Sequence, residues 1–254
     1  MKEMTATLVH APRAASLAPP KPERCLHRHP PLTPSRFFEP RRHLLVIAGV
    51  VFGFLALSAA ISNAWLLLQW DKPIQRFVED NRTDVLDVFF LTASRMGSTF
   101  VVLSIGVLFS ALTWRRCRSV AIAILVATFA RPMVEFVMKG LVERDRPNLE
   151  RMVNGVGYSF PSGHVMASVA LWGLLPLVVG LFTTNRKLWW LSVGVAGFMI
   201  VAISMSRMYL GVHWFSDVLG GLLFGSFFLI GIEYIVHRGH GMKPCQHNAP
   251  RDQL

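Results

Sequence analysis

Three short polar clusters lie between residues 139 and 217 of an otherwise apolar sequence. They are Lys139-Gly-Leu-Val-Glu-Arg-Asp-Arg146-Pro147, Pro161-Ser162-Gly163-His164 and Ser206-Arg207-Met-Tyr-Leu-Gly-Val-His213-Trp-Phe-Ser-Asp217. The cations Lys139, Arg146 and Arg207 are suited to bind phosphate oxygens, and the two arginines can do so with bidentate forks. Because phosphoryl transfer depends mainly on positioning and electrostatic stabilisation, we expect the clusters to converge on one phosphate group.

The second cluster precedes a long apolar stretch and is therefore predicted to begin a helix. Ser162 is suited to its N-cap position. Free N–H groups at a helix start bind anions, and Gly163 lets a phosphate approach closely. His164 lies beside this anion site, where it can donate a proton to a leaving oxygen.

His213 and Asp217 are four residues apart at the start of another apolar stretch, so they share one helix face. The carboxylate can fix the imidazole tautomer and stabilise the charge that develops if His213 attacks phosphorus. No acidic cluster accompanies these groups, so we expect no metal and no other cofactor. Each cluster alone has an ordinary structural explanation, such as a cation anchored at a membrane surface. The combination of the three indicates a catalytic site.

The elements that position these clusters are predicted to be membrane-spanning helices, and the fold class is predicted to be all-α. Apolar residues form 52% of the 254 residues and charged residues only 16%, a composition typical of membrane proteins. Residues 71–87 mix five acids and three bases with apolar positions and are predicted to contain an amphipathic helix at the interface. Six stretches are predicted to be transmembrane helices: 44–68, 96–114, 119–138, 165–183, 188–205 and 214–236.

Residues 43–237 are therefore predicted to form one six-helix membrane domain with a tail at each end. Residues 1–42 contain eight of the fifteen prolines and eight Lys or Arg residues, and are predicted to be disordered. Residues 238–254 are predicted to be a second solvated tail. The three cysteines, Cys25, Cys117 and Cys245, show no metal-ligand spacing, and their odd number in scattered positions argues against a disulfide framework.

The distribution of charge predicts how the domain lies in the membrane. Six spans place both termini on one side, and the positive-inside rule identifies that side. Sixteen of the 26 Lys and Arg residues, but only four acids, lie in the two tails and in residues 115–118 and 186–187. In contrast, seven bases and eight acids lie in residues 71–87 and 139–161. Both termini are therefore predicted to be cytoplasmic and the three clusters external. Anionic lipids, rather than nucleic acid, then account for the net charge of +11.

A further polar pair, Arg131 and Glu135, falls within the apolar stretch 119–138. The two residues are four apart and can meet on one helix face, and Glu135 is also four residues before Lys139. Ionisable residues inside a membrane span often serve function, but a structural pair beside Pro132 explains them equally well. Neither residue is predicted to be catalytic.

Together the clusters resemble the signature of the type 2 phosphatidic acid phosphatase superfamily, which includes membrane lipid phosphatases, polyprenyl diphosphate phosphatases and soluble haloperoxidases. The pattern Lys-x6-Arg-Pro, Pro-Ser-Gly-His and Ser-Arg-x5-His-x3-Asp is filled at every position. The resemblance implies that His213 is the nucleophile that forms a phosphohistidine, that Asp217 orients it and that His164 protonates the leaving group. It also implies metal-free chemistry on a phosphate bound by Lys139, Arg146, Ser162, Gly163 and Arg207.

We therefore expect an integral membrane phosphatase of a bacterial inner membrane that removes the terminal phosphate of a lipid phosphate or of undecaprenyl diphosphate. Undecaprenyl diphosphate, phosphatidylglycerophosphate and phosphatidate are the leading substrates. One alternative is a phosphotransferase that passes the phosphoryl group to a second lipid, such as lipid A. Another is a non-catalytic membrane interaction protein that keeps the fold. The sequence defines neither the acceptor nor the oligomeric state.

Overall fold

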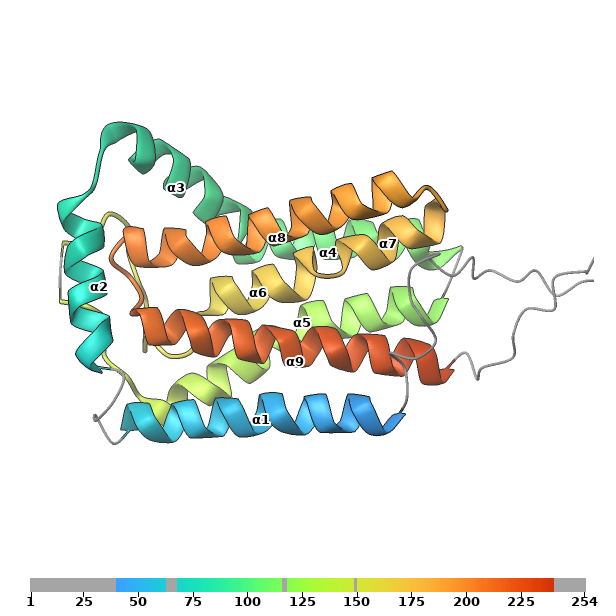
Figure 1. The fold of residues 1–254 in the computed structure, drawn as a ribbon, viewed down its shortest axis with the longest axis horizontal. Coiled ribbons are helices and arrows are strands. Elements are labelled where there is room, and N and C mark those ends of the chain that lie inside the picture. The colour runs from blue at the N-terminus through green and yellow to red at the C-terminus, as the bar shows by residue number, and fades with distance from the viewer. Residues whose placement is uncertain (1–39, 63–67, 116–117, 149, 240–254) are drawn as a thin grey trace, which may run out of the picture.

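The computed structural model describes residues 40–62, 68–115, 118–148 and 150–239, and within these ranges it contains helices and no strands. The all-α prediction is therefore confirmed (Figure 1). The predicted tails lie outside the described residues, except that α1 already begins at Pro40 and α9 continues to Gly239. The helices are α1 (Pro40–Ser62), α2 (Leu68–Asp80), α3 (Asp84–Met96), α4 (Thr99–Trp114), α5 (Arg118–Val142), α6 (Gly163–Trp172), α7 (Leu175–Phe182), α8 (Arg186–Tyr209) and α9 (Phe215–Gly239).

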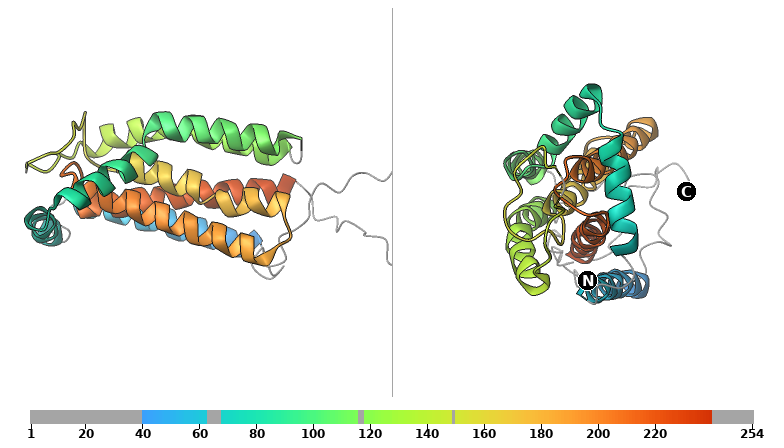
Figure 2. Two further views of the ribbon diagram at one scale, coloured as in Figure 1. Left: turned by 90° about the horizontal axis from the view of Figure 1, so that it is seen from above. Right: turned by 90° about the vertical axis from the view of Figure 1, so that its left-hand side faces the viewer.

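Helix α6 is the centre of the bundle, because it packs against α4, α5, α8 and α9 (Figure 2). Its residues 165–171 are all buried. The contact with α9 is close: a Cβ atom on Gly221 would lie 2.8 Å from the Ser162 carbonyl oxygen, and one on Gly225 would lie 2.6 Å from Val169 Cβ. Glycine at both positions lets the two backbones approach, as in many membrane helix pairs. The start of α6 is thereby held against α9.

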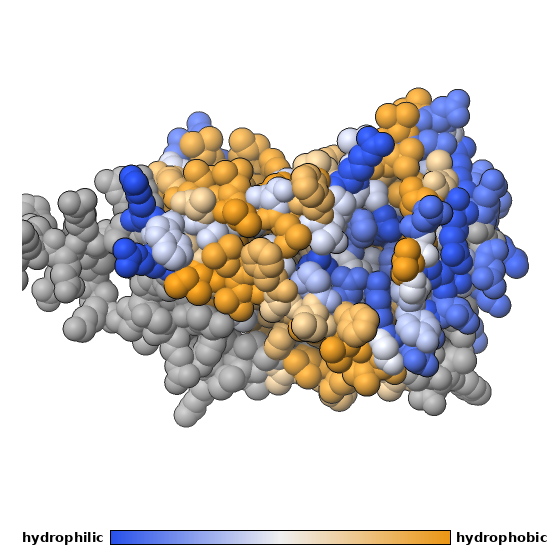
Figure 3. Space-filling view, turned by 180° about the vertical axis from the view of Figure 1, so that it is seen from behind, coloured by the Kyte–Doolittle hydropathy of each residue, from blue (hydrophilic) through white to orange (hydrophobic). Residues whose placement is uncertain are grey.

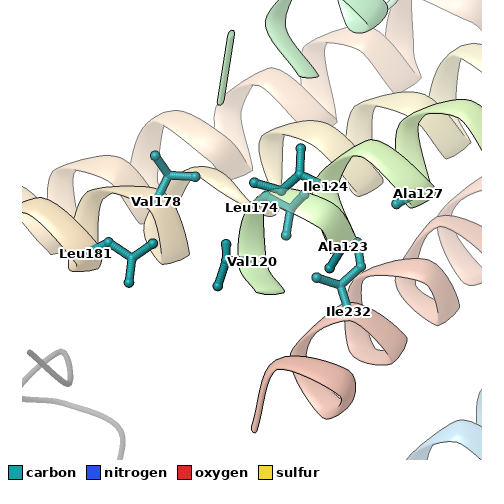
Figure 4. Packing of buried hydrophobic residues seen from close by; sticks show 8 residues of the cluster. All are labelled: Val120, Ala123, Ile124, Ala127, Leu174, Val178, Leu181 and Ile232. Atoms are coloured by element: carbon teal, nitrogen blue, oxygen red, sulfur yellow. The ribbon is translucent and has the colours of Figure 1, made fainter. Parts of the chain in front are cut away.

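A hydrophobic cluster joins α5, α7 and α9 at the end of the bundle opposite α2 (Figure 1, Figure 4). In lipid, such a cluster stabilises the bundle through close packing rather than through removal of apolar surface from water. Its buried members are Val120, Ala123, Ile124, Ala127, Leu174, Val178, Leu181 and Ile232.

Four of the described helical segments are long and apolar enough to cross a membrane: Val120–Val142, Gly163–Phe182, Arg186–Tyr209 and Phe215–Ile232. Helices α3 and α4 would make a fifth if they form one span, bent by 50°. The predicted stretch 165–183 is not one straight helix, because it breaks into α6 and α7. The predicted stretch 44–68 overlaps α1, which ends at Ser62. The number of six spans stays a prediction.

The outer surface matches a membrane protein. Hydrophobic surface covers the middle of the molecule, and hydrophilic surface gathers at the end where α2 lies (Figure 3). Large apolar side chains on the lateral helices point outward rather than into the bundle, among them Phe100, Val126, Phe129, Phe136, Leu191 and Phe198. Such a surface favours lipid contact over water.

Helix α2 lies across one end of the bundle, and α3 runs along α8 (Figure 1). The polar residues Asp71 and Gln75 of α2 are buried against the protein, whereas Trp70 and Phe77 are exposed. The exposed side also carries the charged residues Lys72 and Arg76, so α2 has a buried polar stripe but no purely apolar outer face. Its location at the membrane interface, as expected for residues 71–87, stays a prediction.

Candidate active site

The three polar clusters meet at the end of the bundle that α2 covers (Figure 1). Two cations that were expected just outside the spans instead belong to helices. Lys139 lies in the last turn of α5, and Arg207 lies in the last turn of α8, which continues four residues beyond the predicted end at 205. Gly163 and His164 are the first two residues of α6, and Asp217 is in the first turn of α9. Four helix ends thus supply the cluster residues.

Electrostatic contacts show that these helix ends converge. The charges of Lys139 and Arg207 act on both His164 and His213. The backbone N–H of His213 donates to the Arg207 carbonyl oxygen at 3.2 Å. Nη1 of Arg146 lies 3.4 Å from Nε2 of His213. The first and third clusters therefore surround one imidazole, which is almost fully buried.

Asp217 lies beside His213 but holds other partners more closely. Its Oδ2 atom is 3.5 Å from His213 Nδ1, a separation longer than an ordinary hydrogen bond. Oδ2 accepts from the backbone N–H of Trp214 at 2.9 Å, and Oδ1 accepts from Arg144 Nη1 at 2.6 Å. Since Nδ1 faces the carboxylate, Nε2 is the ring nitrogen left to face a substrate.

Arg144 and Asp71 belong to the site but were not predicted from the sequence. The Arg144 guanidinium bridges two carboxylates, donating to Asp217 Oδ1 and to Asp71 Oδ2, each at 2.6 Å. Asp71 also accepts from the backbone N–H of Ser216 at 2.9 Å and from its hydroxyl at 2.6 Å. Both carboxylates are 0% exposed. This network fixes the start of α9, and with it Asp217, to α2 and to the segment after α5.

Arg207 is held by the end of α3, where Ser94 Oγ accepts a hydrogen bond from its Nη1. The α2–α3 corner also supports the end of α8. Arg82 Nη2 donates to the Tyr209 carbonyl oxygen at 2.9 Å, and the Tyr209 hydroxyl donates to Asp87 Oδ1 at 2.5 Å. Arg82 and Asp87, in the segment expected only to lie on the membrane surface, thus help to hold the end of α8 that carries Arg207.

Arg146 is engaged mainly with main-chain carbonyls. Of the five N–H groups of a guanidinium, four point at carbonyl oxygens 2.8 to 3.2 Å away. The fifth, on Nη1, lies beside His213. The expected bidentate fork toward phosphate is thus reduced to one donor, and the rest of the side chain orders the segment before α6. The carbonyls belong to Val156, Gly157, Tyr158 and Val212.

The start of α6 matches the predicted anion site only in part. Ser162 is at the predicted N-cap position, but its side chain makes no capping hydrogen bond. Its backbone N–H donates to the Asp217 carbonyl oxygen at 3.1 Å, and its buried hydroxyl has no partner among the described residues. That hydroxyl is therefore free to bind a phosphate oxygen. The carboxylate of Glu135, rather than open space, lies against Gly163.

Burial, and then the charges of Arg207, Arg146 and Lys139, lower the pKa of His213 well below its ordinary value of 6.5. A neutral ring keeps the lone pair that a nucleophile needs. We therefore predict that the acid limb of kcat/KM, which reports the free enzyme, lies below pH 6.5. The profile is measured from pH 4.5 to 8, with the second ionisation of the substrate determined separately by phosphorus NMR.

Lys139→Gln removes one of the three charges, so it is expected to raise the pKa of His213 and to shift this limb toward neutral pH. A limb above pH 6.5 in the wild type would contradict the prediction.

Within the described ranges, no group of three His, Cys, Asp or Glu residues could hold a metal ion. Metal-free chemistry stays a prediction. Among the residues that the structure describes, three carboxylates contact the cations of the site directly: Asp71, Glu135 and Asp217. Each of them forms an ion pair with Arg or Lys.

Comparison with known proteins agrees with this architecture. Residues 119–240 match the PAP2 superfamily model. The chain is 30% identical to phosphatidylglycerophosphatase B of Bacillus subtilis over 190 residues, covering 70% of this chain and 89% of the relative. It is 28% identical to an undecaprenyl-diphosphatase of Sulfolobus acidocaldarius over 194 residues, covering 73% and 88%. The crystal structure of a transmembrane PAP2-type phosphatidylglycerolphosphate phosphatase from Bacillus subtilis superposes with a TM-score of 0.67 at 25% identity, covering 76% of this chain and 96% of that one.

These matches extend well beyond the three motifs, across most of the helical bundle. The chain belongs to the PAP2 superfamily.

Proposed function

We propose that this protein is an integral membrane phosphatase that hydrolyses the terminal phosphate of a lipid phosphate or a polyprenyl diphosphate. The observation that carries the proposal is a buried imidazole, His213, surrounded by cations inside a helical bundle with an apolar outer surface. Family membership and the names of the relatives support the same class of substrate.

In the proposed mechanism, His213 Nε2 attacks phosphorus and the bond from phosphorus to the leaving oxygen breaks. His164 gives its proton to that oxygen, so the lipid leaves as an alcohol, or as a monophosphate when the substrate is a diphosphate. Lys139, Arg207, the Ser162 hydroxyl and one N–H of Arg146 stabilise the charge on the phosphoryl oxygens. Asp217 stabilises the positive charge that develops on the His213 ring.

Water then attacks phosphorus of the phosphohistidine while His164 accepts a proton from that water. The bond from phosphorus to His213 Nε2 breaks, and orthophosphate is released. No step requires a metal ion or another cofactor. Because the phosphoryl acceptor is water, the same site would act as a phosphotransferase only if a second lipid reached it in place of water.

We also propose six membrane spans, with α1 as one and α3–α4 as another, both termini cytoplasmic and the site on the external face. Two features support this orientation. The N-terminal end of α1 and the C-terminal end of α9 lie at the same end of the bundle, away from the site (Figure 1). Arg115, Arg118, Arg186 and Lys187 flank the helix connections at that end, as the positive-inside rule expects for the cytoplasmic side.

The proposal is tested by release of inorganic phosphate from phosphatidylglycerophosphate, phosphatidate and undecaprenyl diphosphate by the purified full chain with a chelator present. We expect release from at least one of these lipids, unchanged by the chelator. A second set of reactions contains another lipid and a substrate with a labelled terminal phosphate. Label found on the second lipid and never as free phosphate would identify a transferase, and no reaction with any lipid would overturn the proposal.

A further inference from the structure

The carboxylate of Glu135 occupies the place where the start of α6 should receive a phosphate. Oε2 accepts from Arg131 Nη1 at 2.7 Å, and Oε1 lies 2.9 Å from Lys139 Nζ. A Cβ atom built on Gly163 would lie only 2.0 Å from Oε1, so the carboxylate packs directly on the first residue of α6. An anion is favourable there, because helix N-termini carry partial positive charge and free N–H groups.

The same place holds more donors than this one carboxylate can satisfy. Arg131 Nη1 also donates to the Gly163 carbonyl oxygen at 3.2 Å. Among the buried donors that have no hydrogen-bond partner in the described residues, three belong to residues of this region: Arg131 Nε, Ser162 Oγ and Arg207 Nε. A buried donor without a partner is costly. Ser162 is next to Gly163 in sequence, and Arg131 is hydrogen-bonded to Gly163. A ligand with several acceptor oxygens therefore fits this place.

We propose that Glu135 is a tethered anion that occupies the phosphate-binding place when no substrate is bound and competes with phosphate for Lys139 and for the start of α6. This inference rests on the proposed function. A phosphate that reaches His213 must take Lys139 from Glu135, and the two anions then repel each other at short range. The carboxylate therefore weakens binding of orthophosphate, the product, and promotes its release.

A purely structural role makes the opposite prediction, which makes the proposal testable. If Glu135 served only to hold Lys139 and Arg131 in place, removing its charge would disorder the cations and weaken phosphate binding. If Glu135 competes with phosphate, removing its charge strengthens phosphate binding.

The experiment measures the dissociation constant of inorganic phosphate by calorimetry with the purified full chain and no lipid substrate. We expect Glu135→Gln to lower this constant about 10-fold or more. Glu135→Asp withdraws the carboxylate by one methylene and is expected to give a smaller decrease. Glu150→Gln changes an exposed carboxylate in the segment between α5 and α6 and is expected to leave the constant unchanged.

Weaker or unchanged phosphate binding by Glu135→Gln would overturn the proposal. If neither Glu135 variant folds, the carboxylate is a structural counter-ion and the proposal is also wrong. Because binding is measured without turnover, the result is separate from the proposed function. If the wild type hydrolyses lipid phosphates but Glu135→Gln binds phosphate no more tightly than the wild type, this inference is refuted and the proposed function is not.

Discussion

Replacing His213 with glutamine is expected to reduce phosphate release from lipid substrates by about 10⁴-fold or more, the scale on which loss of a nucleophile acts. Glutamine keeps the size and polarity of the side chain but cannot form the covalent intermediate. The residue is almost fully buried between Arg146 and Asp217, so the substitution adds no new exposed surface. The measurement is kcat for phosphate release by purified protein that shows the same melting behaviour as the wild type.

His164→Gln is the matched variant, because it tests the proton donor rather than the nucleophile. With a lipid substrate we expect a loss of about 10²- to 10⁴-fold. An aryl phosphate, whose leaving group needs no proton, should restore much of the activity of His164→Gln and none of the activity of His213→Gln. Equal rescue of both variants would contradict the assigned roles.

Arg144→Met is expected to destabilise the folded protein by about 3 to 5 kcal/mol, because it leaves buried charges uncompensated. Asp71 and Asp217 are both 0% exposed, and Arg144 is the shared partner of their carboxylates. Activity should fall as well, since Asp217 and the start of α9 lose a fixed position. Stability is measured by thermal unfolding in detergent, and activity by kcat on the same preparation.

Asp71→Asn provides the control within the network. It removes one of the two carboxylates and leaves the pair between Arg144 and Asp217, so its cost should be smaller, and combining it with Arg144→Met should cost less than the sum of the single changes. Arg115→Met, on an exposed arginine at the opposite end, should change stability by less than about 0.5 kcal/mol. Arg144→Met with the stability and kcat of the wild type would refute this role.

The sequence indicated which residues would lie together at the site better than it indicated the residues that hold them in place. Lys139, His164, Arg207 and His213 could be grouped because each occupies a motif with fixed spacing, and the helix ends follow from where the apolar stretches stop. The boundaries were less accurate. Arg207 was expected outside a span, but α8 continues to Tyr209. Apolar composition alone does not say where a helix stops when its last turn contains polar residues.

The contact between Asp71 and Ser216 joins residues 145 apart in sequence, and no local pattern encodes it. Two signals could have suggested the network. Asp71 and Gln75 are polar residues four apart on the predicted interfacial helix, so they share one helix face and could contact the same neighbour. A carboxylate at position 217, at the start of an apolar helix, requires a cation if it is buried. Arg144, which lies between Lys139 and Arg146 in the sequence, could have been considered as that cation.

The spacing of four residues predicted that Arg131 and Glu135 could meet on one helix face, and the structure pairs Glu135 with Arg131 and also with Lys139. Spacing on one helix could not show that the carboxylate would meet Gly163 of α6, because that contact depends on how two helices pack. The same limit applies to Arg146, whose partners are carbonyl oxygens of an irregular segment rather than side chains.

The central claim, that His213 carries the phosphoryl group, is tested most directly by trapping that intermediate. Purified protein is mixed with a lipid substrate whose terminal phosphate is labelled, quenched in base within milliseconds, and digested for mass spectrometry. The account predicts that the wild type carries label on the peptide that contains His213, and that this label is stable in base and lost in acid. The same peptide of His213→Gln should carry no label. Rapid turnover with label found only in free phosphate, together with inversion of configuration at phosphorus, would show direct attack by water and would contradict the account.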